Sequence, residues 1–156
     1  MIFYILLNQI TTLFLSINLL TTLTFDSEIQ SYLYGGVSEE IFFQVTNKNL
    51  TLAIKPKTEG KLSNLLVITK NGKYYFDLAY DKLKPHQFIE IKDGQMTYSL
   101  TKKISTTDYE ILEGDRSLLF VNKKLSEVEV NKIKIKNREY LSKGVPIVYE
   151  GRRILN

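Results

Sequence analysis

The 156-residue sequence contains no cysteine and no tryptophan. Without cysteine the chain has no disulfide, no thiolate metal site and no residue for an N-terminal lipid of the kind that lipoproteins carry. The absence also removes the usual sequence indicator of the redox compartment. Ten tyrosines and eight phenylalanines are present, and this composition is typical of a β-rich protein that packs with aromatic and aliphatic side chains.

Groups for catalysis or metal binding are also scarce. The only histidine, His86, has no second histidine or cysteine with which to form a usual zinc site, and no nucleophile pattern lies beside it. The sequence contains no Gly-x-Ser-x-Gly, no His-Glu-x-x-His and no phosphate-binding loop. The acidic run Asp108, Glu110, Glu113 and Asp115 lacks the regular ligand spacing of a calcium loop. We therefore expect no catalytic residue, no metal site and no cofactor, and we expect His86 to be a surface or loop residue.

Charged side chains are missing from Met1–Phe25, which is rich in isoleucine, leucine and phenylalanine. As a helix this segment would extend about 37 Å, enough to span a bilayer. We predict an N-terminal hydrophobic helix over residues 1–24 that serves as a signal peptide or a membrane anchor. The first residues lack lysine and arginine, which argues against the signal peptide, and scattered asparagine and threonine argue against the anchor. A hydrophobic arm of a soluble assembly is the third alternative.

The rest of the chain carries a dense pattern of strands and turns, centred on Asn49–Leu78. Residues 50–55 alternate strongly apolar with smaller or polar side chains, which is the pattern of a strand with one buried face. The apolar run Leu65–Thr69 then meets Lys73–Leu78 across Asn71-Gly72, a dipeptide that favours the positive φ values of a tight primed turn. This stretch predicts a β-hairpin.

Other short strands follow at intervals of about ten residues, which is the spacing of a β-sandwich or barrel. Phe88–Lys92 and Gln95–Leu100 flank Asp93-Gly94, which predicts a second hairpin. The fold that we predict is all-β, an immunoglobulin-like β-sandwich over residues 25–100, with a β-rich and lysine-rich C-terminal extension over residues 101–156.

Part of this pattern resembles the N-terminal domain of the TraK/CagX/TrbG family. Members of that family have an apolar strand ending in Lys-Pro, then an Asn-Leu followed by β-branched residues and threonine, a turn, and a tyrosine-rich strand. The corresponding residues here are Ile54-Lys55-Pro56, Ser63-Asn64-Leu65, Val67-Ile68-Thr69 and Tyr74–Leu78. The resemblance covers roughly residues 25 to 80.

The resemblance implies a structural subunit of the outer-membrane core complex of type IV secretion and conjugation machines. We expect such a subunit to be exported, periplasmic or associated with the outer membrane, and to contact copies of itself and other envelope subunits. Full-length members carry a second β domain, whose landmarks are not found after residue 100. Functions that the family places in that domain are therefore not implied here.

The positive charge of the chain is C-terminal. Between Asp26 and Tyr98 there are nine acidic and nine basic residues, whereas Ser99–Asn156 has eight acidic and twelve basic ones. Three lysines, Lys132, Lys134 and Lys136, alternate with isoleucines, so in a strand they would share one face. Such a face suits an acidic partner, anionic lipid or nucleic acid, or it protects an edge strand from self-pairing.

We interpret the exposed members of two strands as partner contacts: Tyr74, Phe76, Lys132, Lys134 and Lys136. The alternative function is a free-standing envelope module or chaperone that binds an extended peptide or glycan. Nucleic-acid binding is less well supported, since consecutive aromatics on a strand point to opposite faces and the net charge of +4 is modest.

Overall fold

The computed structural model describes residues 1–96 and 99–156 and confirms that the protein is all-β. The described residues form seventeen strands and one short 3₁₀ turn, η1 (Ser38–Glu40). They divide into two compact units. Unit 1 comprises Met1–Ile2 and Ile10–Lys92, and unit 2 comprises Phe3–Gln9 and Asp93–Asn156.

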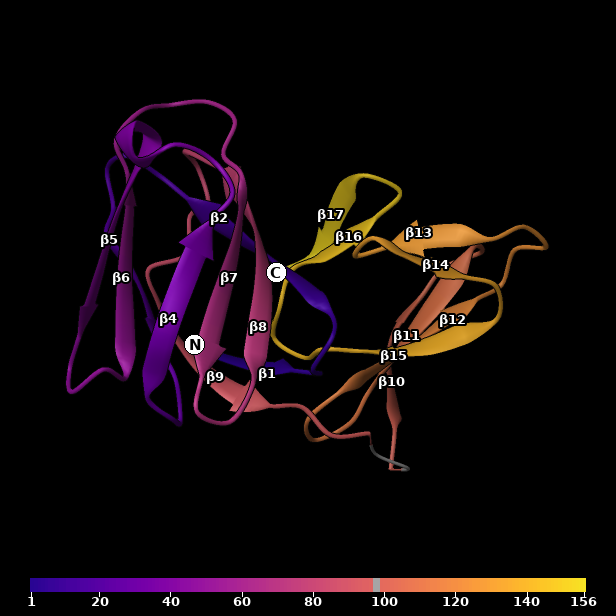
Figure 1. Cartoon of the computed structure of the whole chain (residues 1–156). Coiled ribbons are helices and arrows are strands. Elements are labelled where there is room, and N and C mark those ends of the chain that lie inside the picture. The colour runs from indigo at the N-terminus through magenta and orange to yellow at the C-terminus, as the bar shows by residue number, and fades with distance from the viewer. Residues whose placement is uncertain (97–98) are drawn as a thin grey trace. The chain divides into compact units, whose positions relative to one another are not determined.

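Unit 1 contains two sheets, and Figure 1 shows several of their strands side by side. Sheet A has the order β1-β9-β3-β6-β5, with β1 at Ile2–Ile5, and sheet B has the order β2-β8-β7-β4. The pairs β2–β8 and β3–β9 are parallel, and the pairs β3–β6, β5–β6, β4–β7 and β7–β8 are antiparallel. The bounds are β2 (Ile10–Leu15), β3 (Thr21–Thr24), β4 (Ile29–Tyr34), β5 (Ile41–Thr46), β6 (Thr51–Pro56), β7 (Asn64–Thr69), β8 (Lys73–Tyr80) and β9 (Phe88–Asp93).

The core of unit 1 consists of apolar side chains from both sheets. In most strands buried residues alternate with more exposed ones, as expected for a sheet with one covered face. The exception is β6, where four successive residues are buried, so the expected one-sided strand is buried on both faces. The fully or almost fully buried core side chains include Leu13, Leu15, Leu23, Leu52, Ile54, Leu65, Val67, Phe76 and Ile89.

The predicted N-terminal helix is wrong. Residues 2–24 form three strands, β1 (Ile2–Ile5), β2 and β3. In β2 and β3, buried residues alternate with more exposed ones, which is the period of a strand. Asn8, with φ 74°, makes the left-handed turn between β1 and β2 that a helix would not allow. Within the described residues, no helix combines the length and hydrophobicity needed to cross a membrane.

The N-terminal strands contribute to both units. The Met1 carbonyl accepts a hydrogen bond from Glu90 N (2.9 Å) in unit 1, and the Ile5 carbonyl accepts one from Gly94 N (2.8 Å) in unit 2. Strands β2 and β3 then lie within unit 1. The main passage from unit 1 to unit 2 lies between Lys92 and Asp93.

The hairpin of β7 and β8 is confirmed, but its turn is not the expected one. Neither Asn71 nor Gly72 has positive φ. Instead, Thr69 N donates to the Gly72 carbonyl (2.8 Å), and Thr69 Oγ1 accepts from Asn71 N (3.3 Å) and Gly72 N (3.2 Å). The Thr69 hydroxyl therefore accepts hydrogen bonds from two amides of the turn, and the turn does not need the positive φ values of a primed turn.

The second predicted hairpin is not formed by β9. This strand pairs in parallel with β3, and Gly94 lies close to Ile5 and Leu6. The expected partner strand, Gln95–Leu100, includes residues 97–98, which lie outside the described residues.

Unit 2 contains two antiparallel sheets. Sheet C has the order β10-β11-β12-β15, and sheet D has the order β14-β13-β16-β17. Most neighbours in these sheets are also neighbours in the sequence, so tight turns connect them. The bounds are β10 (Thr101–Ser105), β11 (Tyr109–Glu113), β12 (Leu118–Asn122), β13 (Val128–Val130), β14 (Ile133–Ile135), β15 (Arg138–Leu141), β16 (Ile147–Tyr149) and β17 (Arg152–Leu155).

The predicted lysine strand is shorter than expected. Val130 and Ile133 face each other across a two-residue turn in which Asn131 and Lys132 both have positive φ (49° and 64°). This is the geometry of a type I′ hairpin turn, and it removes Lys132 from the strand. The remaining strand, β14, is the terminal strand of sheet D, which agrees with the edge-strand interpretation.

Candidate functional site

The side of unit 1 formed by β4 and β5 is open. Strand β4 is the terminal strand of sheet B, and β5 is the terminal strand of sheet A. Terminal strands present main-chain donors and acceptors that a further strand can pair with. We call β4, β5 and the adjoining η1 the open edge.

A groove of about 410 Å³ runs along the open edge. Both sheets contribute aromatic side chains to it. The lining residues are Tyr32, Tyr34, Gly36, Ser38, Ile41, Phe42, Phe43 and Lys57. We refer to this hollow as the aromatic groove.

Strand alternation explains why aromatic rings meet here. Phe43 points inward from β5 and contacts two rings of β4, with centroid distances of 5.2 Å to Tyr32 and 5.5 Å to Tyr34. Tilted pairs at these distances are favourable arrangements for aromatic quadrupoles. Phe42, the neighbour of Phe43, points the other way and is 40% exposed. The groove thus has a rigid aromatic floor and one exposed phenyl group.

The rim of the aromatic groove is fixed by polar contacts. Tyr34 OH donates to Glu40 Oε2 (2.6 Å) and accepts from Ser63 N (3.0 Å). Burial and the hydrogen bond to the Glu40 carboxylate raise the pKa of the Tyr34 phenol above its ordinary value, so the ring remains a neutral donor at physiological pH. Lys57 N donates to the Glu40 carbonyl (2.8 Å), and Lys57 Nζ donates to the Ser38 carbonyl (3.3 Å).

This arrangement suits binding of an extended chain segment. The terminal strands offer main-chain hydrogen bonds, and the aromatic groove offers an apolar recess for a side chain of the bound segment. The polar groups at the rim, Glu40 and Lys57, are engaged in contacts that hold η1 in place. Their role is therefore to shape the recess.

Two of the predicted contact residues are corrected by the structure. Tyr74 and Phe76 are only 6% and 1% exposed, because they point into the core of unit 1, where Tyr74 lies 5.2 Å from the Phe25 ring. The exposed aromatic of β8 is Tyr75. Nucleic-acid binding, which the sequence supported less well, would have no stacking surface from these two buried rings.

The three predicted lysine contacts are exposed in unit 2. Lys134 lies opposite Glu129 in the β13–β14 pair, so part of its charge faces a carboxylate on the neighbouring strand. Their role as partner contacts stays a prediction.

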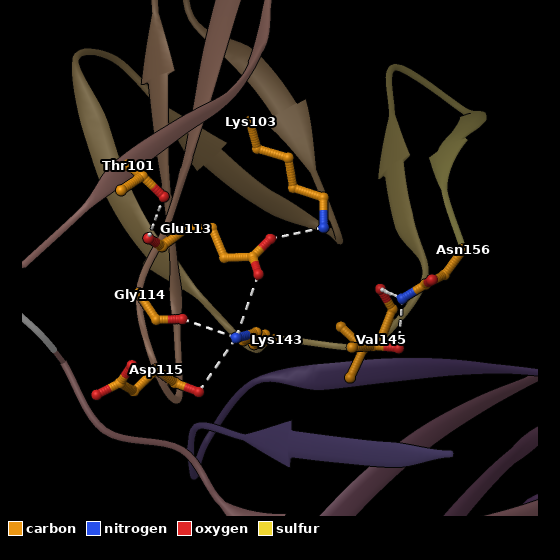
Figure 2. A network of polar contacts seen from close by, with 9 residues as sticks. Thr101, Lys103, Glu113, Gly114, Asp115, Lys143, Val145 and Asn156 are labelled. Atoms are coloured by element: carbon orange, nitrogen blue, oxygen red, sulfur yellow. Dashed lines mark hydrogen bonds and ion pairs between the residues drawn. The ribbon is translucent and has the colours of Figure 1, made fainter.

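Unit 2 holds the acidic residues that were considered for a cation site. Glu113 accepts from Lys103 (2.6 Å) and lies 3.3 Å from Lys143, whose ammonium group also donates to the carbonyls of Gly114 and Asp115, as Figure 2 shows. The hydrogen bond from Lys103, with a smaller contribution from Lys143, lowers the pKa of the Glu113 carboxyl.

A second carboxylate of the same strand is arranged in the same way. Glu110 lies 3.2 Å from Lys123 and 3.3 Å from Lys102, and hydrogen bonds from Lys123 and Lys102 lower the pKa of its carboxyl. Across residues 1–96 and 99–156, no three acidic or histidine side chains converge as a metal site. The carboxylates of β11 are thus balanced by lysines.

His86 lies in the loop between β8 and β9, which is one of the two predicted alternatives, but it is not a surface residue. The side chain is buried, and its Nδ1 accepts a hydrogen bond from Phe14 N (3.0 Å). The main chain is also held, because His86 N donates to the Phe14 carbonyl (2.7 Å) and Thr21 Oγ1 donates to the His86 carbonyl (2.6 Å). His86 therefore connects the loop before β9 to β2 and β3.

Sequence reasoning missed the aromatic groove. Its residues were recognised only as parts of two separate strands, and nothing local indicates that Tyr32 and Phe43 meet across the two sheets. The sequence did contain one indication of an exposed aromatic side chain. Phe42 and Phe43 are consecutive, and one of two successive residues in a strand must point outward.

Comparisons with models of known protein families and with curated proteins find no match for this chain.

Proposed function

We propose that the protein is a non-catalytic structural subunit of a cell-envelope secretion or conjugation assembly and that it acts through protein–protein contacts at the open edge. The observation that carries this proposal is the aromatic groove between two terminal strands. Such a site needs no reactive side chain, because recognition comes from main-chain pairing and the burial of apolar surface. The resemblance of residues 25–80 to the TraK/CagX/TrbG family supplies the class of assembly.

The proposed location is beyond the inner membrane, in the periplasm or at the outer membrane. Strands β2 and β3 bury leucines in the core of unit 1, so we propose that the assembled protein keeps Met1–Phe25 in its fold. Mass spectrometry of the N-terminus of native protein from fractionated cells tests both statements. A native chain that starts near Phe25, or one recovered in the cytosol alone, would contradict them.

The contact itself is tested by F42E. Phe42 is the exposed ring of the aromatic groove, so a carboxylate there opposes burial against a partner while the core remains intact. Leu83→Glu is the matched control, because Leu83 is also an exposed apolar residue of unit 1 but lies away from the groove lining. Cross-linking and membrane pull-down should recover envelope secretion subunits with wild type and L83E, and at least about tenfold less with F42E.

The same geometry favours a second candidate, a free-standing module that binds an extended peptide. Both functions use the open edge, but they differ in particle size. Light scattering of material extracted from envelopes should show a large complex for the subunit and a small particle for the module. Equal recovery of partners by F42E and L83E would reject the open edge for both.

A further inference from the structure

The outer face of sheet B carries an apolar row that crosses all four strands. Leu33 of β4 lies opposite Leu66 of β7, Leu66 lies opposite Tyr75 of β8, and Tyr75 lies opposite Ile10 of β2. Directly opposite residues of neighbouring strands point to the same face. We call Leu33, Leu66, Tyr75 and Ile10 the apolar row.

The apolar row is open to solvent on unit 1. Leu33 is 63%, Tyr75 41% and Ile10 38% exposed, and Leu66 is half-buried between its neighbours. The adjacent residues of the same strands, including Leu65, Phe76 and Thr11, are buried on the opposite face. A contiguous exposed apolar patch on a sheet that already has a core on its other face is typical of an interaction surface.

Charges flank the apolar row on both sides. Along β8, Lys73 and Asp77 point to the same face as Tyr75 and lie about 7 Å from it in opposite directions along the strand. Lys73 lies next to Ile68 of β7, and Asp77 lies next to Asn64 of β7 and Thr12 of β2. Along β8 this face therefore carries the positive charge of Lys73, the apolar ring of Tyr75 and the negative charge of Asp77, in that order.

This order is self-complementary for one orientation of two copies. Consider two copies that pack with the outer faces of their B sheets together and are related by a two-fold axis that runs along the apolar row. This rotation makes the two β8 strands antiparallel and places the apolar row of one copy on the apolar row of the other. The same rotation brings Lys73 of one copy over Asp77 of its mate, and it does so twice. An axis parallel to the strands would instead place lysine over lysine. Closed two-fold contacts of this kind are the commonest form of self-association.

We infer that the outer face of sheet B binds the same face of a second copy of this chain, with the two β8 strands antiparallel. The inference assigns one of the self-contacts of the proposed function to a surface distinct from the aromatic groove. A row of four side chains is small compared with the roughly 800 Å² per partner of a stable interface, so we expect a dissociation constant of about 10–100 µM.

Sedimentation equilibrium of the full chain from about 1 to 500 µM measures this constant. The double variant I10K/Y75K places charges in the apolar row and should raise the dissociation constant at least about tenfold. The matched control L83K/L125K introduces the same charges at two other exposed leucines and should leave it unchanged. Circular dichroism of each variant checks that the fold is retained.

A charge exchange tests the orientation. K73D sets two carboxylates opposite each other in the antiparallel arrangement and should weaken the dimer about tenfold, whereas the double exchange K73D/D77K restores opposite charges and should return the constant to within about threefold of wild type. Both arrangements predict this rescue, so a mixture of wild type and K73D/D77K decides the orientation. In the antiparallel arrangement mixed dimers set like charges opposite each other and should be weaker than either homodimer, whereas in the parallel arrangement they set opposite charges together and should be stronger. A wild-type chain that stays monomeric at 500 µM, an unchanged constant for I10K/Y75K, or absence of rescue overturns the inference. F42E should not alter this constant, so failure of the groove proposal is separable from failure of the dimer.

Discussion

The two units are both β-sheet structures, yet they connect their strands in different ways. In unit 1, β2 pairs in parallel with β8, and β3 pairs in parallel with β9, although more than fifty residues separate the partners. In unit 2, tight turns join most paired strands, and lysine–glutamate pairs cover one sheet. Both units bury an apolar core, but unit 1 depends more on contacts between distant segments, whereas unit 2 uses local turns and adds partly exposed ion pairs.

This difference makes the N-terminal strands the most sensitive part of the molecule. Leu13 of β2 is completely buried in unit 1, so L13A leaves a cavity and should lower the free energy of unfolding by about 2–5 kcal/mol. Denaturant unfolding measures the loss, and hydrogen exchange should show that amides of unit 1 lose more protection than those of unit 2.

Thr12→Ala is the matched control for this prediction. Thr12 is the neighbour of Leu13 on the same strand but belongs to the outer face, so T12A should change the free energy of unfolding by less than about 1 kcal/mol. If L13A were as mild as T12A, β2 would not be an integral part of the sheet.

The next largest effect is expected at the contact between His86 and β2. His86 Nδ1 accepts from Phe14 N, so this nitrogen carries no proton and the neutral ring holds its proton on Nε2. H86L removes the acceptor from a partly buried amide and should lower the free energy of unfolding by about 1–3 kcal/mol.

His86→Asn is the informative comparison, because its amide oxygen can take the place of Nδ1. We expect H86N to recover at least half of the stability that H86L loses, measured by denaturant unfolding. Equal losses in the two variants would show that ring packing against Phe14, at a centroid distance of 5.8 Å, matters more than the hydrogen bond.

The same contrast explains how much of the structure the sequence could reveal. The β7–β8 pair was predicted because it combines two strand-forming runs with a turn between them. The strand character of Met1–Phe25 was missed, because leucine-rich residues without charge match a helix in composition, and the parallel partners of β2 and β3 lie far along the chain.

The candidate sites were only partly predictable for a related reason. The sequence indicated that one face of β8 is exposed, but the facing was assigned the wrong way: Tyr75 is outside, and Tyr74 and Phe76 are inside. In a run of three aromatic residues, either set of alternate side chains is apolar enough to point into the core. Only the pairing register with β7 and β2 determines which set is buried. The aromatic groove depends on two sheets meeting, which local patterns do not encode.

The smallest effect should come from the charge network of unit 2 and should depend on pH. The Lys103 and Lys143 ammonium groups lower the pKa of the Glu113 carboxyl in the folded state. A carboxyl with a lowered folded pKa stabilises the fold above its unfolded pKa of about 4.3 and loses that contribution as the pH falls through the folded value. Glu113→Gln should therefore be slightly less stable than wild type at pH 7, and the difference should shrink and disappear as the pH falls through the lowered folded pKa of Glu113.

Salt separates this network from the rest of the molecule. Partly exposed ion pairs are screened within a Debye length of about 3 Å at 1 M salt, so the difference between wild type and E113Q at pH 7 should shrink when 1 M sodium chloride is added. The difference between wild type and L13A should persist, because cavity formation in unit 1 involves no charge. A loss of stability for E113Q that did not change with pH or salt would mean that Glu113 acts by packing, and the ion pairs of β11 would then not contribute to the stability of unit 2.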